Sequence, residues 1–95
     1  RLRRIYSVKF EFNALKDRLN LAKHGIGLAF AELLFVDGAH IVEDSRCDYG
    51  EERLIASGLI EGRLFVCVFV KRYDVVRVIS LRKGNARERA AFDKH

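Results

Sequence analysis

One apolar run constrains the fold of this chain more than any other stretch of its sequence. In the segment "RLFVCVFVK", residues 63–71, seven of the eight positions from Leu64 to Lys71 are apolar. A run of this length, with β-branched and aromatic side chains and no alternation, is typical of a strand that is buried on both faces. Such a strand needs neighbours on both sides, so the sequence predicts a sheet with residues 63–71 at its centre.

Turn signals flank this run and predict the neighbouring strands. Glu61 and Gly62 favour a tight hairpin into the run, and "RYD", residues 72–74, favours a turn out of it. Period-two or mixed apolar patterns predict four further strands, in residues 5–12, 40–44, 51–59 and 75–81.

Capping residues mark a first helix after the first strand. Asn13 is a favoured N-cap residue. Behind it, Leu15, Leu19 and Ala22 recur at helical spacing on one face. Gly25 suits the left-handed position that ends many helices.

Two more helices complete the predicted order. Residues 28–35, "LAFAELLF", are apolar enough to form a helix that packs on the sheet. Asn85 and Glu88 have the spacing of a capping box at the start of a short C-terminal helix. We therefore expect an α+β fold in the order β-α-α-β-β-β-β-α. Its sheet should be mainly antiparallel, packed against the N-terminal helices and followed by the short C-terminal helix.

The charge of the chain is uneven. The net charge is +5, but residues 71–95 carry eight Lys or Arg against three acids, whereas residues 37–61 carry two against seven. The basic segment suits a polyanionic partner such as a nucleic acid, and the acidic segment suits a basic partner. A solvated surface with segregated charges is the simpler alternative.

Other features bound the class of protein. Cys47 and Cys67 form no CxxC pair, so we expect buried or free thiols, no metal site and no cofactor. The sequence contains no uninterrupted apolar stretch of membrane-spanning length, and we expect a cytoplasmic protein. At 95 residues the chain predicts one domain over residues 1–95, with "RLRR", residues 1–4, as an upstream extension or a vector-derived remnant.

Two arginines stand out in the last strand, "VVRVISLR". Strict alternation predicts Arg77 on one face and Arg82 on the other. An arginine in the body of an apolar strand needs water, a carboxylate or a ligand phosphate. A structural role, in which Arg77 pairs with an acid and ties strands together, is nearly as well supported as a catalytic one. The acids considered are Glu51, Glu52 and Asp74.

Three sequence blocks, "FNALKDRLNLAKHG", "GEERLIASG" and "RVISLRKGNARER", follow one another along the chain. In this order they resemble the BrnT family of type II toxin–antitoxin toxins. "FNALKDRLNLAKHG" carries the family's Lys, Asn and Lys-His-Gly at Lys16, Asn20 and residues 23–25. "GEERLIASG" is similar to its Gly-Glu-x-Arg, followed by a strand and Gly58. "RVISLRKGNARER" is similar to its Arg-x-Ile-Ser-x-Arg-Lys with Arg-Glu-Arg behind. The resemblance runs from about Phe10 to Phe92.

The chain also departs from the family pattern. It has Phe12 and Asn13 where the family usually has Trp-Asp, and Gly84 where it usually has Ala. Phe92 replaces a frequent Tyr, so no role of a phenolic hydroxyl is carried over.

The resemblance implies a fold and action like those of the RelE ribonucleases. We therefore expect an endoribonuclease that needs no metal and inhibits translation. It also implies a BrnA-like antitoxin that neutralises the toxin and binds operator DNA, with the toxin as co-repressor. The alternative is a non-catalytic basic nucleic-acid-binding module or co-repressor, which would protect RNA without cleaving it.

Cleavage of RNA needs cations against the developing phosphorane charge and groups that move protons. The catalytic candidates are His24, Arg53, Arg77 and Arg82. The RNA-binding candidates are Lys23, Glu52, Ser80, Lys83 and Arg87. From spacing alone His24 is explained at least as well by the helix end, where the dipole favours it. Glu52 is alternatively the partner of another cation, since it should face away from Arg53 on a strand.

The acidic stretch from Asp37 to Glu61 is a hypothetical docking surface for basic parts of the antitoxin. Charge reversal at Asp44 and Glu51 would test it through complex affinity and its salt dependence.

Overall fold

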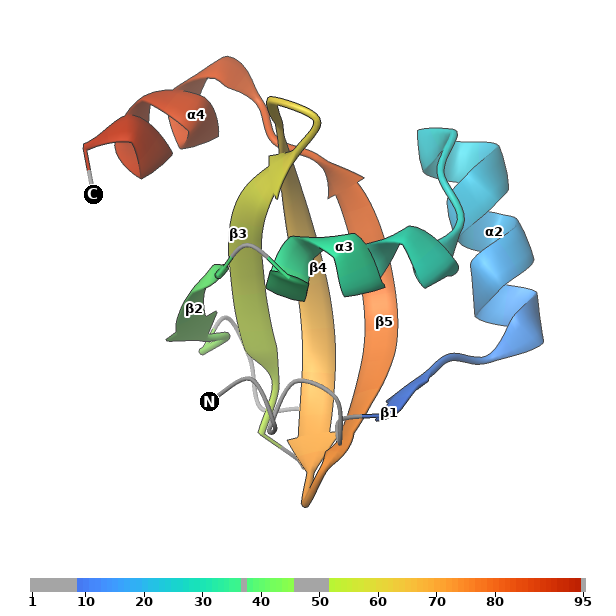
Figure 1. Cartoon of the computed structure of the whole chain (residues 1–95). Helices are drawn as coiled ribbons and strands as arrows, with labels where there is room; N and C mark the ends of the chain where they lie inside the picture. The colour runs from blue at the N-terminus through green and yellow to red at the C-terminus, as the bar shows by residue number, and fades with distance from the viewer. Residues whose placement is uncertain (1–8, 37, 46–51, 95) are drawn as a thin grey trace.

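A computed structural model of the chain describes residues 9–36, 38–45 and 52–94. Over these residues the fold is α+β, with one mixed five-stranded sheet and three α-helices (Figure 1). The elements are β1 (Lys9–Glu11), α2 (Ala14–His24), the 3₁₀ turn η1 (Leu28–Phe30), α3 (Ala31–Val36), β2 (His40–Glu43), β3 (Leu54–Ile60), β4 (Arg63–Arg72), β5 (Val75–Lys83) and α4 (Ala86–Asp93). The predicted helix over residues 28–35 is thus divided between η1 and α3.

The sheet has the strand order β1-β5-β4-β3-β2, which puts the apolar run in the central strand β4, as predicted. The β1–β5 pairing is parallel and the other three are antiparallel. Glu61 and Gly62 have φ angles of 51° and 79° and form the predicted two-residue hairpin between β3 and β4. Tyr73, with φ 55°, turns the chain from β4 into β5.

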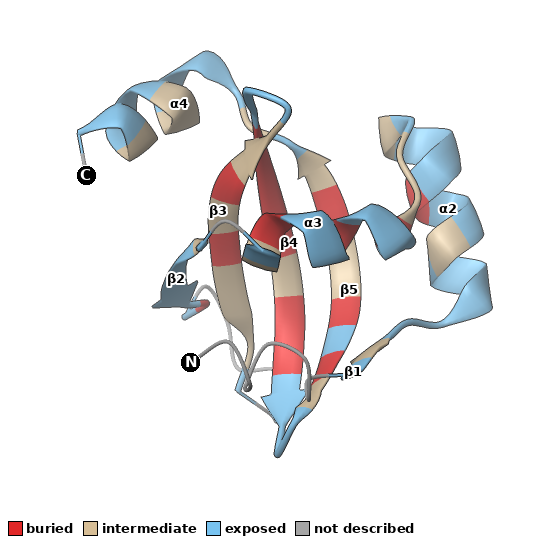
Figure 2. Ribbon diagram, in the orientation of Figure 1, coloured by how far each residue is buried: buried red, intermediate tan, exposed pale blue. Residues whose placement is uncertain are grey.

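The core lies between one face of the sheet and the segment η1–α3. Figure 2 shows buried positions on β3, β4, β5 and the inner side of α3. The largest fully buried side chains are Phe69, Leu28, Leu34, Leu81, Val78 and Cys67. Burial raises the pKa of the Cys67 thiol to about 12, so this free cysteine is an apolar core residue as expected. Cys47 lies outside the described residues.

Helix α2 begins and ends where the sequence predicts. The Asn13 side chain accepts hydrogen bonds from the first turn, and Gly25 takes a left-handed conformation with φ 76°. The face of α2 that packs against the rest of the protein, however, is not the face that carries its leucines. Leu15 and Leu19 are 56% and 59% exposed, whereas Asn20 is only 7% exposed.

Asn20 is buried because its amide completes the edge of β5. β1 pairs with β5 only as far as Arg77, so the β5 backbone beyond that point needs other partners. The Asn20 Nδ2 donates to the Leu81 carbonyl at 2.7 Å, and the Leu81 N–H donates to Asn20 Oδ1 at 3.2 Å. In the same way Asp17 accepts from the Leu28 N–H at 2.7 Å. Polar side chains therefore hold α2 against β5 and η1.

A β-bulge overturns the prediction that Arg77 and Arg82 lie on opposite faces. The β4–β5 register shifts between Val68 and Phe69, which leaves Ile79 as an extra residue in β5. The pairs across the bulge are Arg77 with Val70, Ser80 with Val68 and Arg82 with Val66. These three β4 positions are two residues apart, so their side chains, and those of both arginines, lie on one face of the sheet. This face is turned away from η1 and α3, and we call it the distal face.

Helix α4 is joined to the sheet by polar contacts and contains no buried residue. Asn85 and Glu88 form the predicted capping box. Arg89 Nη1 donates to the Gly62 carbonyl at 3.2 Å. Gly84 precedes the helix, and a Cβ there would lie 2.5 Å from Leu64 Cδ2. A methyl group at position 84 would therefore collide with Leu64, which favours glycine here.

Within the described residues, no single helix is long and apolar enough to cross a membrane. Ala14–His24 and Leu28–Val36 reach that length and composition only as a pair, and they are bent by 89° at their break.

Candidate nucleic-acid interface

The distal face carries an apolar strip along β4, with polar and basic residues on its β5 side. The strip is formed by Val66, Val68 and Val70, of which Val66 and Val70 are only 6% exposed. Arg77, Ser80 and Arg82 flank the strip on β5. Val70 and Val66 are four residues apart, so the backbone positions of Arg77 and Arg82 are separated by about 13 Å along the strand. An extended strand of nucleic acid that follows β4 would meet these arginines at successive positions.

Arg77 is paired with an acid, but not with one of those that the sequence suggested. Its Nη1 lies 3.3 Å from Oε2 of Glu11 in β1, with the side chains 53% and 52% exposed. The parallel β1–β5 register places the two residues side by side. A solvated ion pair of this kind contributes about 0–1 kcal/mol, so it does not by itself account for an arginine in this strand.

Arg82 is turned toward α4. Its two terminal nitrogens donate to the two carboxylate oxygens of Glu88 at 2.9 and 2.7 Å. These hydrogen bonds, together with one from the Asn85 N–H, lower the pKa of Glu88 to about 2. Arg82 Nη1 also donates to the Lys83 carbonyl at 3.1 Å. Arg87 is exposed in the first turn of α4.

Arg53 directly precedes β3 and is partly buried. The next residue, Leu54, pairs with Phe69, so Arg53 lies level with Val70, on the other side of the strip from Arg77. Its carbonyl accepts a hydrogen bond from the Asp44 N–H at 2.8 Å. Glu52 is exposed beside it and precedes the strand rather than lying within it.

Asp44 does not fit the predicted acidic docking surface. Its exposure is 4%, so its charge is not displayed to a partner, and replacing it with Lys would disturb the fold rather than test docking. Glu51 lies outside the described residues. Glu43, Glu52 and Glu61 are the exposed acids described in this stretch.

His24 lies in the last turn of α2 and is half-buried. It shares a helix face with Asp17 and Asn20, because these positions are three and four residues apart. Since Asn20 contacts Leu81, His24 lies one turn farther along, toward the end of β5 that carries Arg82. Lys23 is exposed beside it. Lys83 pairs with Phe65 and so projects from the opposite face of the sheet to Arg82.

The sequence reading missed His40. Its position on β2 pairs with Ser57, which pairs with Val66 and in turn with Arg82, so these four residues form one row across the distal face. Only the register reveals this row, because nothing in the short segment around His40 indicates which strand it joins.

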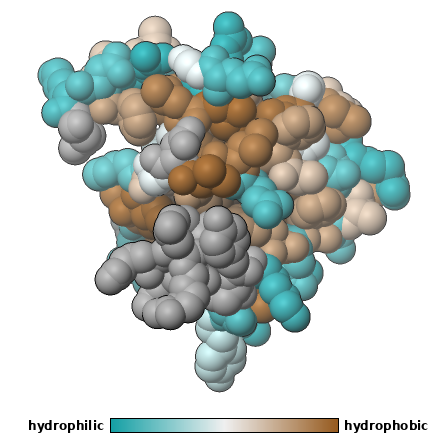
Figure 3. All heavy atoms as spheres, viewed as in Figure 1, coloured by the Kyte–Doolittle hydropathy of each residue, from teal (hydrophilic) through white to brown (hydrophobic). Residues whose placement is uncertain are grey.

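An apolar hollow lies on the other side of the molecule. It is lined mainly by Ile26, Phe30, Leu33, Ile60 and Phe65, with a volume of about 290 Å³. Phe30 and Leu33 are 51% and 47% exposed, and Figure 3 shows apolar surface gathered over η1 and α3. Exposed apolar surface of this kind is typical of contacts with other proteins.

Comparison with known protein families gives a match over most of the chain. Residues 12–88 match a family described as "Ribonuclease toxin, BrnT, of type II toxin-antitoxin system". The chain belongs to the BrnT family. The match contains the first two sequence blocks, the third block except for Arg89, and the strands β2 to β5. Membership in BrnT implies an RNA substrate and an antitoxin partner. A search of curated proteins found no significant match.

No group of three or more His, Cys, Asp or Glu side chains within the described ranges is placed to hold a metal ion.

Proposed function

We propose that this BrnT toxin is an endoribonuclease that cleaves RNA on its distal face without a metal, in a RelE-like fold and manner, and so inhibits translation in the cytoplasm. The observation that carries the proposal is the bulge in β5, which brings Arg77, Ser80 and Arg82 to one face beside the valines of β4. Arg53 borders the same strip from the β3 side.

In this mechanism Arg82 contacts the reacting phosphate, because it lies at the end of β5 nearest His24. A guanidinium is planar and always charged, and it keeps this charge while it contacts Glu88 and the Lys83 carbonyl. The charge of Arg82 stabilises the extra negative charge of the pentacoordinate transition state. Arg77 and Arg53 hold the neighbouring part of the RNA strand.

His24 moves the protons. An imidazole changes charge near neutral pH, so it can take the proton of the 2′-hydroxyl or return one to the leaving 5′-oxygen. Attack of the 2′-oxygen breaks the bond from phosphorus to the 5′-oxygen and leaves a 2′,3′-cyclic phosphate. Lys23, Ser80 and Arg87 bind the RNA around this point, with Glu52 at the border of the site. Lys83, which projects from the opposite face of the sheet, is not part of this group.

The antitoxin partner implied by the family is, we propose, BrnA-like. It neutralises the toxin and binds operator DNA, and the toxin acts as co-repressor. Expression of the chain alone should arrest growth, and co-expression of the small gene beside its own should relieve the arrest.

The direct test of the function is incubation of the purified chain with single-stranded RNA in the presence of a chelator. We expect new fragments that end in 2′,3′-cyclic phosphate. Protection of RNA with a steep salt dependence and no cut ends would instead support the non-catalytic nucleic-acid-binding module.

A further inference from the structure

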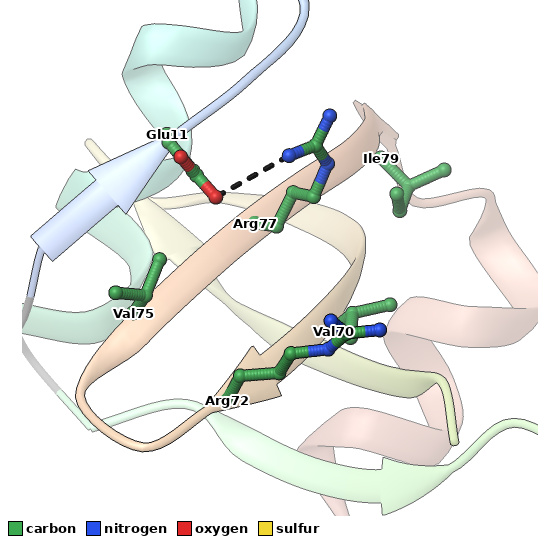
Figure 4. A pocket seen from close by; sticks show the side chains of 6 residues that line it. All are labelled: Glu11, Val70, Arg72, Val75, Arg77 and Ile79. Carbon is green, nitrogen blue, oxygen red and sulfur yellow. Dashed lines mark hydrogen bonds and ion pairs between the residues drawn. The ribbon is translucent and has the colours of Figure 1, made fainter. Parts of the chain in front are cut away.

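A cavity of about 260 Å³ opens on the distal face at the β1 side of the sheet. Figure 4 shows its lining residues, which come from β1, β4 and β5. They are Glu11, Val70, Arg72, Val75, Arg77 and Ile79. The cavity therefore combines an apolar floor with two guanidinium groups and one carboxylate.

The two arginines occupy opposite corners of a square of side chains. Arg72 pairs with Val75, and Val70 pairs with Arg77, so Arg72 and Arg77 are diagonal neighbours. Diagonal neighbours on one face of an antiparallel pair are about 7–8 Å apart. That separation applies where the two side chains leave the backbone, and it is twice the contact distance of about 3.5–4.0 Å between packed atoms. With the two side chains turned toward each other, one flat ring would fit between their guanidinium planes. Unpaired RNA bases stack on arginine planes in this way.

Glu11 supplies the polar edge of the cavity. One of its oxygens, Oε2, contacts Arg77, and among the described residues its Oε1 has no hydrogen-bond partner. A carboxylate only accepts hydrogen bonds, so it selects a ligand edge that carries donors. Guanine offers two adjacent donors on its Watson–Crick edge, N1–H and the 2-amino group. Adenine, cytosine and uracil each present at most one donor next to an acceptor, which a carboxylate repels.

We propose that this cavity is a guanine-binding subsite, in which Arg72 and Arg77 stack on the base and Glu11 accepts from its Watson–Crick edge. The inference rests on the proposed function for its ligand, a single strand of RNA. It makes Glu11 and Arg72 residues that determine specificity. Along the strand direction, Glu11 lies about 13 Å and Arg72 about 20 Å from the level of Arg82. Glu11 thus has a role in base recognition. Its exposed ion pair with Arg77 would by itself contribute little to stability.

The test measures binding of 2′-O-methyl pentanucleotides, which cannot be cleaved because the attacking hydroxyl is blocked. The probes are UUGUU, UUAUU, UUUUU and the inosine analogue UUIUU, which lacks the 2-amino group. We expect the full chain to bind the guanine probe about tenfold more tightly than the adenine and uracil probes, with inosine between them. In Glu11→Gln the guanine preference should fall to about twofold or less, since an amide repels none of the other bases as strongly.

Two further variants separate recognition from charge. Arg72→Lys keeps the charge but removes the plane, so it should weaken binding of all four probes while the order of preference remains. Glu43→Gln changes an exposed acid on β2 whose partner, Leu54, points to the core face, and it should leave the guanine preference unchanged. Equal binding of all probes by the wild type, or a guanine preference that survives Glu11→Gln, would overturn the proposal.

Failure of the subsite and failure of the proposed function are distinguishable. If ordinary RNA is cleaved while binding shows no guanine preference, the subsite is wrong and the function stands. If guanine is preferred in binding but no RNA is cleaved, the subsite stands and the nuclease proposal fails.

Discussion

Arg82 donates two hydrogen bonds, of 2.9 and 2.7 Å, to the carboxylate of Glu88 and thereby joins the end of β5 to α4. The same carboxylate accepts from the Asn85 N–H at 2.9 Å and so closes the capping box of that helix. One side chain therefore fixes both the start of α4 and the direction of the arginine that we place at the reacting phosphate. Because α4 has no buried residue, this contact is central to its position.

The Glu88 carboxylate should make stability depend on pH. Its folded-state pKa of about 2 lies below its ordinary value of 4.5, so its contribution is present above pH 4.5 and is lost as the pH falls through about 2. The side chain is 32% exposed, and after allowance for solvent screening we expect Glu88→Gln to cost about 1 kcal/mol at pH 7. Urea unfolding at pH 7, 4 and 3 should show this difference shrink as the pH falls.

The control for this prediction is Asp93→Asn, which removes the Arg89–Asp93 ion pair of the same helix. Asp93 is 55% exposed, so its loss should cost no more than about 0.5 kcal/mol. An equal effect of both substitutions, or a Glu88 effect that is constant with pH, would contradict the assigned contact.

Asn20→Ala should destabilise the protein far more than loss of an apolar residue from the same helix. It leaves the Leu81 N–H and carbonyl unpaired at a buried edge, which should cost about 2–4 kcal/mol. Leu19→Ala, at a position that is 59% exposed, should cost about 0.5 kcal/mol or less. Denaturant unfolding of the two variants measures both losses of unfolding free energy. A larger loss for Leu19→Ala than for Asn20→Ala would mean that α2 packs through its leucines.

Gly84→Ala should also destabilise the protein, because the added methyl group would collide with Leu64. The added Cβ would lie 2.5 Å from Leu64 Cδ2 and 2.8 Å from Leu64 Cγ, and Leu64 is only 3% exposed. We expect a cost of about 1–3 kcal/mol from this overpacking. In a double-mutant cycle with Leu64→Ala, the alanine at position 84 should cost much less than in the wild-type background, and additive effects would refute the contact.

Local signals in the sequence were sufficient for most of the elements. The caps at Asn13 and Asn85, the left-handed Gly25 and the central strand β4 depend on neighbours along the chain, and all are confirmed. The bulge at Ile79 could not be predicted from "VVRVISLR", because strict alternation fits those letters equally well and only the β4 register excludes it.

The packing of α2 and the partners of the arginines depend on long-range contacts. Leu19 and Asn20 are adjacent in sequence, and hydrophobicity alone favours burial of the wrong one. Asn20 is buried because it pairs with the edge of β5 at Leu81. That edge has no strand partner because β1 ends opposite Arg77. The Glu11–Arg77 pair follows from the parallel pairing of β1 with β5. These strands are far apart in the chain, so no local sequence pattern predicts the pair.

The proposed role of His24 predicts that its replacement slows cleavage. His24→Gln keeps a polar side chain at the end of α2, but an amide cannot act as a general acid or base. We expect the cleavage rate to fall by about a hundredfold or more while RNA binding is retained. If His24→Gln keeps the wild-type rate while His40→Gln does not, the proton-transfer residue is His40, in the row that contains Arg82.

The most direct measurement of the central claim is the rate of RNA cleavage, with chelator present, by the wild type and by Arg77→Ala, Arg82→Ala and Arg18→Ala. Arg18 is an exposed cation on α2 and serves as the matched control, with circular dichroism to verify folding. We expect Arg82→Ala to lose about a hundredfold or more in rate, Arg77→Ala to weaken RNA binding as well as cleavage, and Arg18→Ala to behave as the wild type. Undiminished cleavage by correctly folded Arg82→Ala would contradict the account.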